Sequence, residues 1–229
     1  MQPSITTVQG LVRAAARTVL GDDVRVVGAS RTDAGVHALR QVVSLVTERS
    51  LDAASVARAL NANLPGDVRV IGACEAPPDF DARRRATGKR YAYAIDTGPV
   101  ASPLLRRYAW HVPAALHLGA MREGLAALRG AHDFSAFCAA PGRGAMPECR
   151  VRAVHVVVRG ARLVVTISAD RFLHHMVRNI VGSAVLVGKG THPPRWVGEV
   201  LASKDRRLAG PTAPAHGLFL VRVLYGEGE

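Results

Sequence analysis

Residues 151–187 read VRAVHVVVRGARLVVTISADRFLHHMVRNIVGSAVLV, and this stretch decides the fold. Apolar runs rich in β-branched residues predict strands over 151–158 and 163–168. From Phe172 onward the apolar residues form one broad face at helical spacing, which predicts a helix over 172–187. Two adjacent strands followed by a helix are the centre of a β-α-β-β-α-β unit, the ferredoxin-like arrangement.

The rest of the chain extends this pattern in both directions. The second half completes the unit with a strand over 90–96, a helix over 114–128, a short extra helix over 194–203 and a strand over 217–224. The first half repeats it as a helix over 5–20, strands over 24–27 and 41–46, a helix over 52–61 and a strand over 68–74. The opening strand of this first copy is absent.

We therefore predict an α+β protein of two ferredoxin-like (βαββαβ, RRM-like) halves, residues 1–80 and 81–229, with antiparallel or mixed sheets. The missing strand leaves a sheet edge without a partner, which invites self-association. Two explanations compete: a start codon assigned too far downstream, or a gene that makes a shortened and weakened protein. We favour the first, because every motif further along is intact and residues 2–4 look like the end of a preceding segment.

The composition restricts the class of protein. The chain has 229 residues, 48% of them hydrophobic, and a formal net charge of +12. No apolar run approaches the ~20 residues of a membrane helix, and the N-terminus lacks a secretion signal, so we expect a cytoplasmic protein without membrane contact. The positive charge is typical of a protein that binds a polyanion.

Metal and cofactor sites are not expected. Cys74, Cys138 and Cys149 lack metal-ligand spacing, so we interpret them as buried or half-buried thiols. His174 and His175 are adjacent on the predicted helix and would project to different faces, which prevents a shared metal. No phosphate-binding glycine loop is present, so no nucleotide cofactor is expected.

A polar loop between two predicted strands carries a single carboxylate. Residues 30–38 read SRTDAGVHA. On local chemistry alone, Asp33 before Ala-Gly is typical of a turn whose carboxylate binds nearby backbone N–H groups. Loops held by rigid strands are also where catalytic groups concentrate.

Residues 31–38, RTDAGVHA, resemble the active-site signature of the bacterial TruA family of tRNA pseudouridine synthases. Five further segments resemble that family in its own order: NANLPGD (61–67), DARRRATGKRYAY (81–93), GAHDFS (130–135), HHMVRNIVG (174–182) and AHGL (215–218). The resemblance covers nearly the whole chain, from about Ser4 to Tyr225. It departs at the start, where the family has an additional strand and an aromatic segment.

The resemblance implies an active site in the cleft between the two halves, with Asp33 as its nucleophile. Asp33 would attack the sugar or remove the 2′ proton, and the sequence leaves both pathways open. Arg178 would form an ion pair with Asp33 across the interface of the halves, and a bidentate pair would also fix the carboxylate. The alternative for Arg178 is a side chain that reaches water past its apolar neighbours.

Three further residues would bind the substrate. Tyr91 would stack on the flipped uracil, Leu218 would form an apolar wall, and Arg31 would hold the pocket mouth. The alternatives are plain: strand packing for Tyr91, core packing for Leu218 and a solvated loop charge for Arg31.

The implied activity is that of an isomerase. The family converts uridine to pseudouridine at positions 38, 39 and 40 of the tRNA anticodon stem-loop, as a homodimer and without a cofactor. Backbone contacts to tRNA would come from the basic residues Arg83, Arg84, Arg85, Lys89, Arg90, Arg106 and Arg107. Two alternatives are an RNA-binding module of the same fold that lost catalysis with its first strand, and a metabolite-binding domain, which would not need the positive charge.

Overall fold

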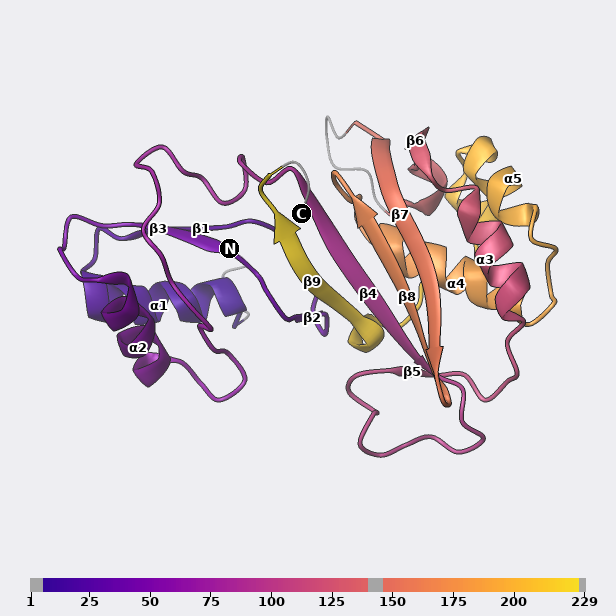
Figure 1. Cartoon of the computed structure of the whole chain (residues 1–229), viewed down its shortest axis with the longest axis horizontal. Coiled ribbons are helices and arrows are strands. Elements are labelled where there is room, and N and C mark those ends of the chain that lie inside the picture. The colour runs from indigo at the N-terminus through magenta and orange to yellow at the C-terminus, as the bar shows by residue number, and fades with distance from the viewer. Residues whose placement is uncertain (1–5, 140–145, 227–229) are drawn as a thin grey trace. The chain divides into compact units, whose positions relative to one another are not determined.

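The computed structural model describes residues 6–139 and 146–226 of the chain. These residues divide into two compact units (Figure 1). Unit 1 comprises residues 1–31 and 41–86, and unit 2 comprises residues 32–40 and 87–229. The loop that carries Asp33 therefore interrupts unit 1 in sequence and folds with unit 2.

Unit 1 is a two-stranded sheet with two helices. Its elements are α1 (Val8–Leu20), β1 (Arg25–Gly28), β3 (Val43–Val46) and α2 (Ala53–Asn63). β1 and β3 are antiparallel, with Arg25 opposite Val46 and Gly28 opposite Val43. Apolar residues of both helices and of β1 and β3 pack together into one core. The helices predicted over 5–20 and 52–61 are present, although Ile5 lies outside the described residues.

The strand predicted over 68–74 is wrong. Residues 68–74 adopt no regular structure, and Ile71 is 76% exposed. Unit 2 shows the physical reason. There the last strand of the β-α-β-β-α-β pattern pairs with the first strand. Unit 1 has no described strand in that first position, so residues 68–74 lack the backbone partner that would make them a strand.

Unit 2 contains the larger sheet. Its strands are β2 (His37–Ala38), β4 (Gly88–Asp96), β5 (Trp110–His111), β6 (Gly130–Asp133), β7 (Glu148–Arg159), β8 (Arg162–Ala169) and β9 (Leu218–Leu224). They run in the order β2-β9-β4-β8-β7-β6, and β5 pairs with β4. Within this sheet, β9-β4-β8-β7 is an antiparallel core (Figure 1). The predicted α+β class is thereby confirmed.

Three helices accompany this sheet: α3 (Leu118–Ala126), α4 (Met176–Gly188) and α5 (Trp196–Ser203). Short 3-10 helices span Ser135–Phe137, Arg206–Leu208 and Ala215–Gly217. Alternate residues of β7 are buried, so one face of the strand packs inside the unit and the opposite face is mostly exposed. Most residues of α4 are buried, so α4 forms the centre of the unit's core. No helix among residues 6–139 and 146–226 is long and apolar enough to cross a membrane.

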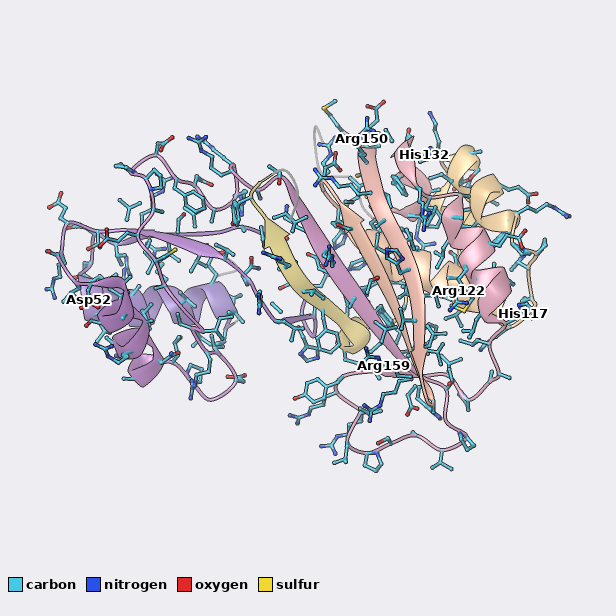
Figure 2. The ribbon with its side chains drawn as sticks, viewed as in Figure 1. Asp52, His117, Arg122, His132, Arg150 and Arg159 are labelled. Carbon is cyan, nitrogen blue, oxygen red and sulfur yellow. The ribbon has the colours of Figure 1, made fainter. Side chains whose placement is uncertain are left out.

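Side chains fix where the helices begin. Thr7 accepts a hydrogen bond from the Gly10 amide at 3.1 Å, and Asp52 accepts one from the Ser55 amide at 2.8 Å. His117 does the same for α3, accepting from the Ala120 amide at 3.0 Å. Asp52 and His117 stand at these helix starts in Figure 2. The cap at His117 explains why α3 begins there and not at the predicted residue 114.

Two of the three cysteines are buried as expected, but Cys74 is exposed. The prediction for Cys74 is wrong: this residue ends a segment, 68–74, that forms no strand and leaves its side chain exposed. Burial raises the pKa of the Cys149 thiol to about 11, so this thiol stays protonated and unreactive at neutral pH.

Candidate active site

The Asp33 loop is held by the edge of the unit 2 sheet. Residues 33–36 form a turn in which the Val36 amide donates to the Asp33 carbonyl at 3.1 Å. Gly35 takes a φ of 81°, a left-handed conformation that glycine adopts without strain. The chain then enters β2, which pairs in parallel with β9, and the Leu39 amide donates to the Leu220 carbonyl at 2.9 Å. This short ladder positions the carboxylate of Asp33, whose side chain is 31% exposed.

Arg178, the third residue of α4, contacts Asp33. Its Nη1 lies 3.1 Å from Asp33 Oδ2, and its side chain is 14% exposed. Its Nε donates to the Ala213 carbonyl at 2.7 Å, and the Ala213 amide donates back to the Arg178 carbonyl at 3.1 Å. One guanidinium nitrogen therefore holds the carboxylate while another holds the backbone. Asp33 thus accepts one hydrogen bond from Arg178, and this ion pair is not bidentate.

The helix that carries Arg178 starts later than the sequence indicates. A helix was expected from Phe172, but α4 begins at Met176. The correction has a backbone cause: His175 has φ 60° and ψ 6°, which is left-handed and cannot continue a right-handed helix toward the N-terminus. Non-glycine residues pay for this conformation and tend to adopt it at functional sites.

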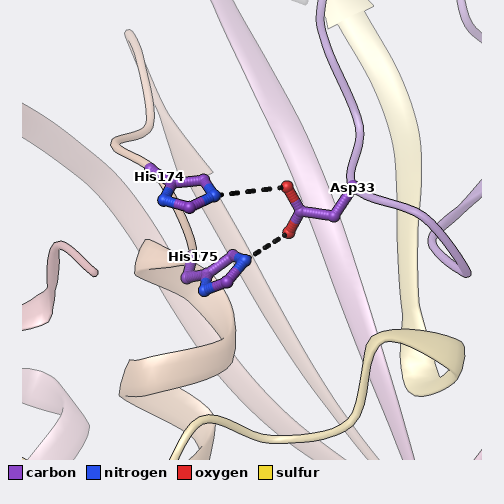
Figure 3. A group of neighbouring side chains, drawn as sticks. All are labelled: Asp33, His174 and His175. Atoms are coloured by element: carbon purple, nitrogen blue, oxygen red, sulfur yellow. Dashed lines mark ion pairs between the residues drawn. The ribbon is translucent and has the colours of Figure 1, made fainter. Parts of the chain in front are cut away.

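This backbone turn brings both histidines to Asp33 (Figure 3). His175 Nε2 is 3.2 Å from Asp33 Oδ2, and His174 Nε2 is 3.8 Å from Oδ1. The two rings lie 3.9 Å apart between centroids and are tilted by 31°. The expectation that adjacent histidines diverge is wrong, because it assumed that both residues lie within the helix.

Arginine side chains place positive charge around Asp33 and His175. Arg178 supplies a cation in direct contact, and such a cation stabilises a carboxylate that is partly removed from water. Burial lowers the pKa of His175 below its usual range, and the positive charges of Arg178 and Arg206 act in the same direction. The negative charge of Asp33 opposes them without overcoming them. His175 is thus biased toward the neutral form, in which it donates one hydrogen bond and accepts another.

A segment that we call the strap, residues 206–213, fixes α4 at the level of Arg178. Asn179, which is fully buried, accepts hydrogen bonds from Arg206 at 3.0 Å and from Thr212 at 2.6 Å. Asn179 also donates to the Phe137 carbonyl at 2.7 Å. Sequence reasoning missed this residue, although an asparagine inside an apolar helix is a recognisable sign of a buried polar network.

Tyr91 and Leu218 lie in the same unit as Asp33. Tyr91 is 7% exposed on β4, and its ring meets Phe172 edge-on at 4.9 Å. Phe172 begins the segment that leads to the two histidines. Leu218 is 6% exposed and is the first residue of β9, the strand that holds the Asp33 loop. The next tyrosine, Tyr93, donates to the Pro214 carbonyl at 2.7 Å and has a pKa raised by burial.

The remaining predicted residues are basic and mostly exposed. Arg31 is exposed and belongs to unit 1, as do Arg83, Arg84 and Arg85. Arg85 forms an ion pair with Asp79, which reduces the charge that this residue offers to a ligand. In unit 2, Arg90, Arg106 and Arg107 are exposed and Lys89 is half-buried.

The arrangement offers one chemistry clearly. A partly exposed carboxylate, paired with an arginine and oriented by a sheet edge and a helix start, can act as a nucleophile or as a base. Two imidazoles beside it can donate or accept hydrogen bonds.

A family model described as tRNA pseudouridine synthase matches residues 1–83 and 125–226 of the chain. The match includes Asp33, Arg178 and Leu218, whereas Tyr91 lies between its two segments. Among curated relatives, proteins named tRNA pseudouridine synthase A from Myxococcus xanthus, Methylococcus capsulatus and Geobacillus kaustophilus are each 44% identical to this chain. The alignments cover 100%, 96% and 99% of this chain and 86%, 82% and 88% of the relatives. These comparisons give no support to an inactive RNA-binding module.

Proposed function

The chain belongs to the tRNA pseudouridine synthase family, and from this premise we propose that it isomerises uridine to pseudouridine in tRNA, at positions 38, 39 and 40 of the anticodon stem-loop. The observation that carries the proposal is the Asp33 carboxylate within the matched residues, 3.1 Å from the Arg178 guanidinium. The reaction is an isomerisation: the bond from C1′ to N1 breaks, a bond from C1′ to C5 forms, C5 loses its proton and N1 gains one.

Asp33 is the nucleophile in this proposal. Its carboxylate attacks C1′ as the uracil leaves, and the freed base turns so that C5 faces the sugar. C5 then attacks C1′, the bond between C1′ and Asp33 breaks, and the carboxylate is released. Removal of the 2′ proton by the same carboxylate is the second pathway, and both pathways require an ionised carboxylate. A single donor from Arg178 leaves the other carboxylate oxygen available to the substrate.

The substrate base must leave its stack to reach Asp33, at a cost of a few kcal/mol. We assign Tyr91 to stacking on the extruded uracil, which contributes roughly 1–3 kcal/mol, and Leu218 to the apolar wall of its pocket. Arg31 holds a phosphate or fills the vacated stack. The seven basic residues from Arg83 to Arg107 contact the tRNA backbone.

We also propose that the protein acts as a homodimer in the cytoplasm, as the family resemblance implies. Light scattering of the purified chain tests this assembly: a mass near twice 24.3 kDa supports it, and a monomer at micromolar concentration contradicts it.

Tritium release from tRNA labelled at uracil C5 tests the reaction, because joining through C5 expels that hydrogen. We expect release by the wild type and a loss of roughly 10³-fold or more in Asp33→Ala. The matched control is Asp22→Ala, which removes an exposed aspartate of unit 1. Carbodiimide mapping of the product then locates the modified positions. Equal release by wild type and Asp33→Ala would refute the role of Asp33.

A further inference from the structure

Three side chains at the site carry atoms that bind transition metals. Asp33, His174 and His175 each offer one ligand atom, and these three atoms all lie within 4.8 Å of one another. Tetrahedral zinc with ligand bonds of about 2.0–2.2 Å separates neighbouring ligand atoms by about 3.4 Å. His174 Nε2 lies 3.8 Å from Oδ1 of Asp33, and His175 Nε2 lies 3.2 Å from Oδ2. Both separations are close to that value, and each imidazole faces a different oxygen of the carboxylate.

The convergence is imposed by the backbone. His175 keeps a left-handed conformation that a histidine adopts only when its surroundings hold it there. Because of this turn, both Nε2 atoms point toward Asp33, as Figure 3 shows. Water reaches the group, since the side chains of His174, His175 and Asp33 are 47%, 24% and 31% exposed. A hydrated ion can therefore enter and keep a water in its fourth position.

Charge and ligand type select the ion. Two imidazoles and one carboxylate suit zinc, whereas magnesium and calcium prefer oxygen ligands alone. Arg178 and Arg206 are the cations near this group, and they oppose a divalent ion. Arg178 contacts only Oδ2, however, so Oδ1 remains available as a ligand.

We propose that Asp33, His174 and His175 form a binding site for Zn²⁺, and that zinc bound there blocks the enzyme. The blocking part rests on the proposed function, since it assumes that Asp33 is the nucleophile. Zinc bound to Oδ1 withdraws electron density from the carboxylate and occupies the place where C1′ would approach, so Asp33 cannot attack the sugar. The site is thus inhibitory, and zinc and the target uridine compete for the same oxygen.

Direct binding tests the site without any substrate. Chelator-treated full-length protein is titrated with ZnCl₂ against a chromophoric zinc indicator, with no tRNA present. We expect one site per chain, and a weakening of at least about tenfold in His174→Ala and in His175→Ala, because loss of even an outer-shell partner costs about 10–100-fold. Thermal melts verify that both variants are folded.

Two controls separate this site from other zinc ligands. His155→Ala removes an exposed histidine of β7, and Cys74→Ser removes an exposed thiol. Both should bind zinc as the wild type does. Equal zinc affinity in the wild type and in folded His174→Ala and His175→Ala would overturn the site.

Inhibition is measured separately, by tritium release at increasing ZnCl₂ with reversal by chelator. Wild type and His155→Ala should be inhibited over the range in which the indicator reports binding. Binding at the histidine pair without inhibition would refute the blocking role. If the wild type released no tritium at all, the proposed function would fail, while the binding titration would still decide the zinc site.

Discussion

Arg178 shares its guanidinium between two acceptors, the Asp33 carboxylate and the Ala213 carbonyl. The side chain is therefore anchored to the strap before it reaches the carboxylate. A planar guanidinium can satisfy both directions at once, whereas an ammonium is a point charge on a flexible stem. At this scale, the identity of the cation matters as much as its charge.

We expect Arg178→Lys to lower kcat/KM about 100-fold, because a displacement of about 1 Å at a catalytic group costs that much. Tritium release measures the loss, and circular dichroism should show an unchanged fold. Arg195→Lys is the matched control, since Arg195 is 79% exposed and pairs with Glu199 on α5. Activity within twofold of the wild type in Arg178→Lys would show that charge alone suffices.

The sequence predicted single residues unevenly. Asp33 and Arg178 were named together only through the family resemblance, because no periodicity links residues 145 positions apart. The approach of His174 and His175 to Asp33 was missed. It depends on one left-handed φ angle at His175, and no local pattern predicts such an angle in a non-glycine residue.

At the scale of elements, α4 and the strap pack closely against each other. Gly182 allows their close approach: a Cβ at this position would stand 1.7 Å from the Pro211 carbonyl oxygen. Ser183 accepts from the Gly210 amide at 2.9 Å, one turn beyond the contacts of Asn179. The strap thus runs along α4 between Ser183 and Arg178 and ends at Ala213, where it supports Arg178.

Gly182→Ala should therefore be strongly destabilising, by about 3 kcal/mol or more, since backbone must move to relieve the overlap. Gly198→Ala is the control on α5, where the new Cβ meets only the Ala127 side chain at 3.5 Å. That change should be neutral or stabilise by up to about 1 kcal/mol. Urea unfolding followed by tryptophan fluorescence measures both, because Trp110 and Trp196 lie in unit 2. Equal midpoints would contradict the close packing of the strap.

Elements with strong local periodicity were predicted well, and those made by distant pairing were not. Helices α1 to α5 and the long strands β4, β7 and β8 follow apolar patterns in the sequence. β2 and β5 are two residues long and exist only because β9 and β4 lie beside them. The strand predicted over 68–74 failed for the opposite reason, since its pattern was adequate but no strand among residues 6–139 and 146–226 pairs with it.

At the scale of the whole molecule, positive charge is the dominant property. The net charge of +12 arises from 30 basic and 18 acidic residues. Such a charge accelerates association with any nucleic acid, so it does not by itself identify the residues that touch tRNA. The cluster Arg83, Arg84 and Arg85 is a specific candidate, because all three side chains are exposed in unit 1.

Replacing these three arginines by serine should weaken tRNA binding and flatten its dependence on salt. Each phosphate contact contributes about 0.9 to the slope of log K against log salt concentration, so loss of all three lowers the slope by about 2 to 3. Fluorescence anisotropy at several KCl concentrations measures it. The control is the triple change of Arg17, Arg49 and Arg58 to serine, three exposed arginines of the same unit. An identical slope in both variants would mean that only net charge matters.

The nine residues 32–40 fold with unit 2 although unit 1 surrounds them in the sequence. The chain consequently passes between the units three times, after residues 31, 40 and 86. No single cut of the gene can yield a fragment that holds all of unit 2, Asp33 included, without also carrying residues 41–86 of unit 1. A fragment of residues 87–229 would keep Arg178 and both histidines but not the carboxylate they face. A recombination event that exchanges unit 1 as one continuous segment, residues 1–86, therefore also exchanges the nucleophile.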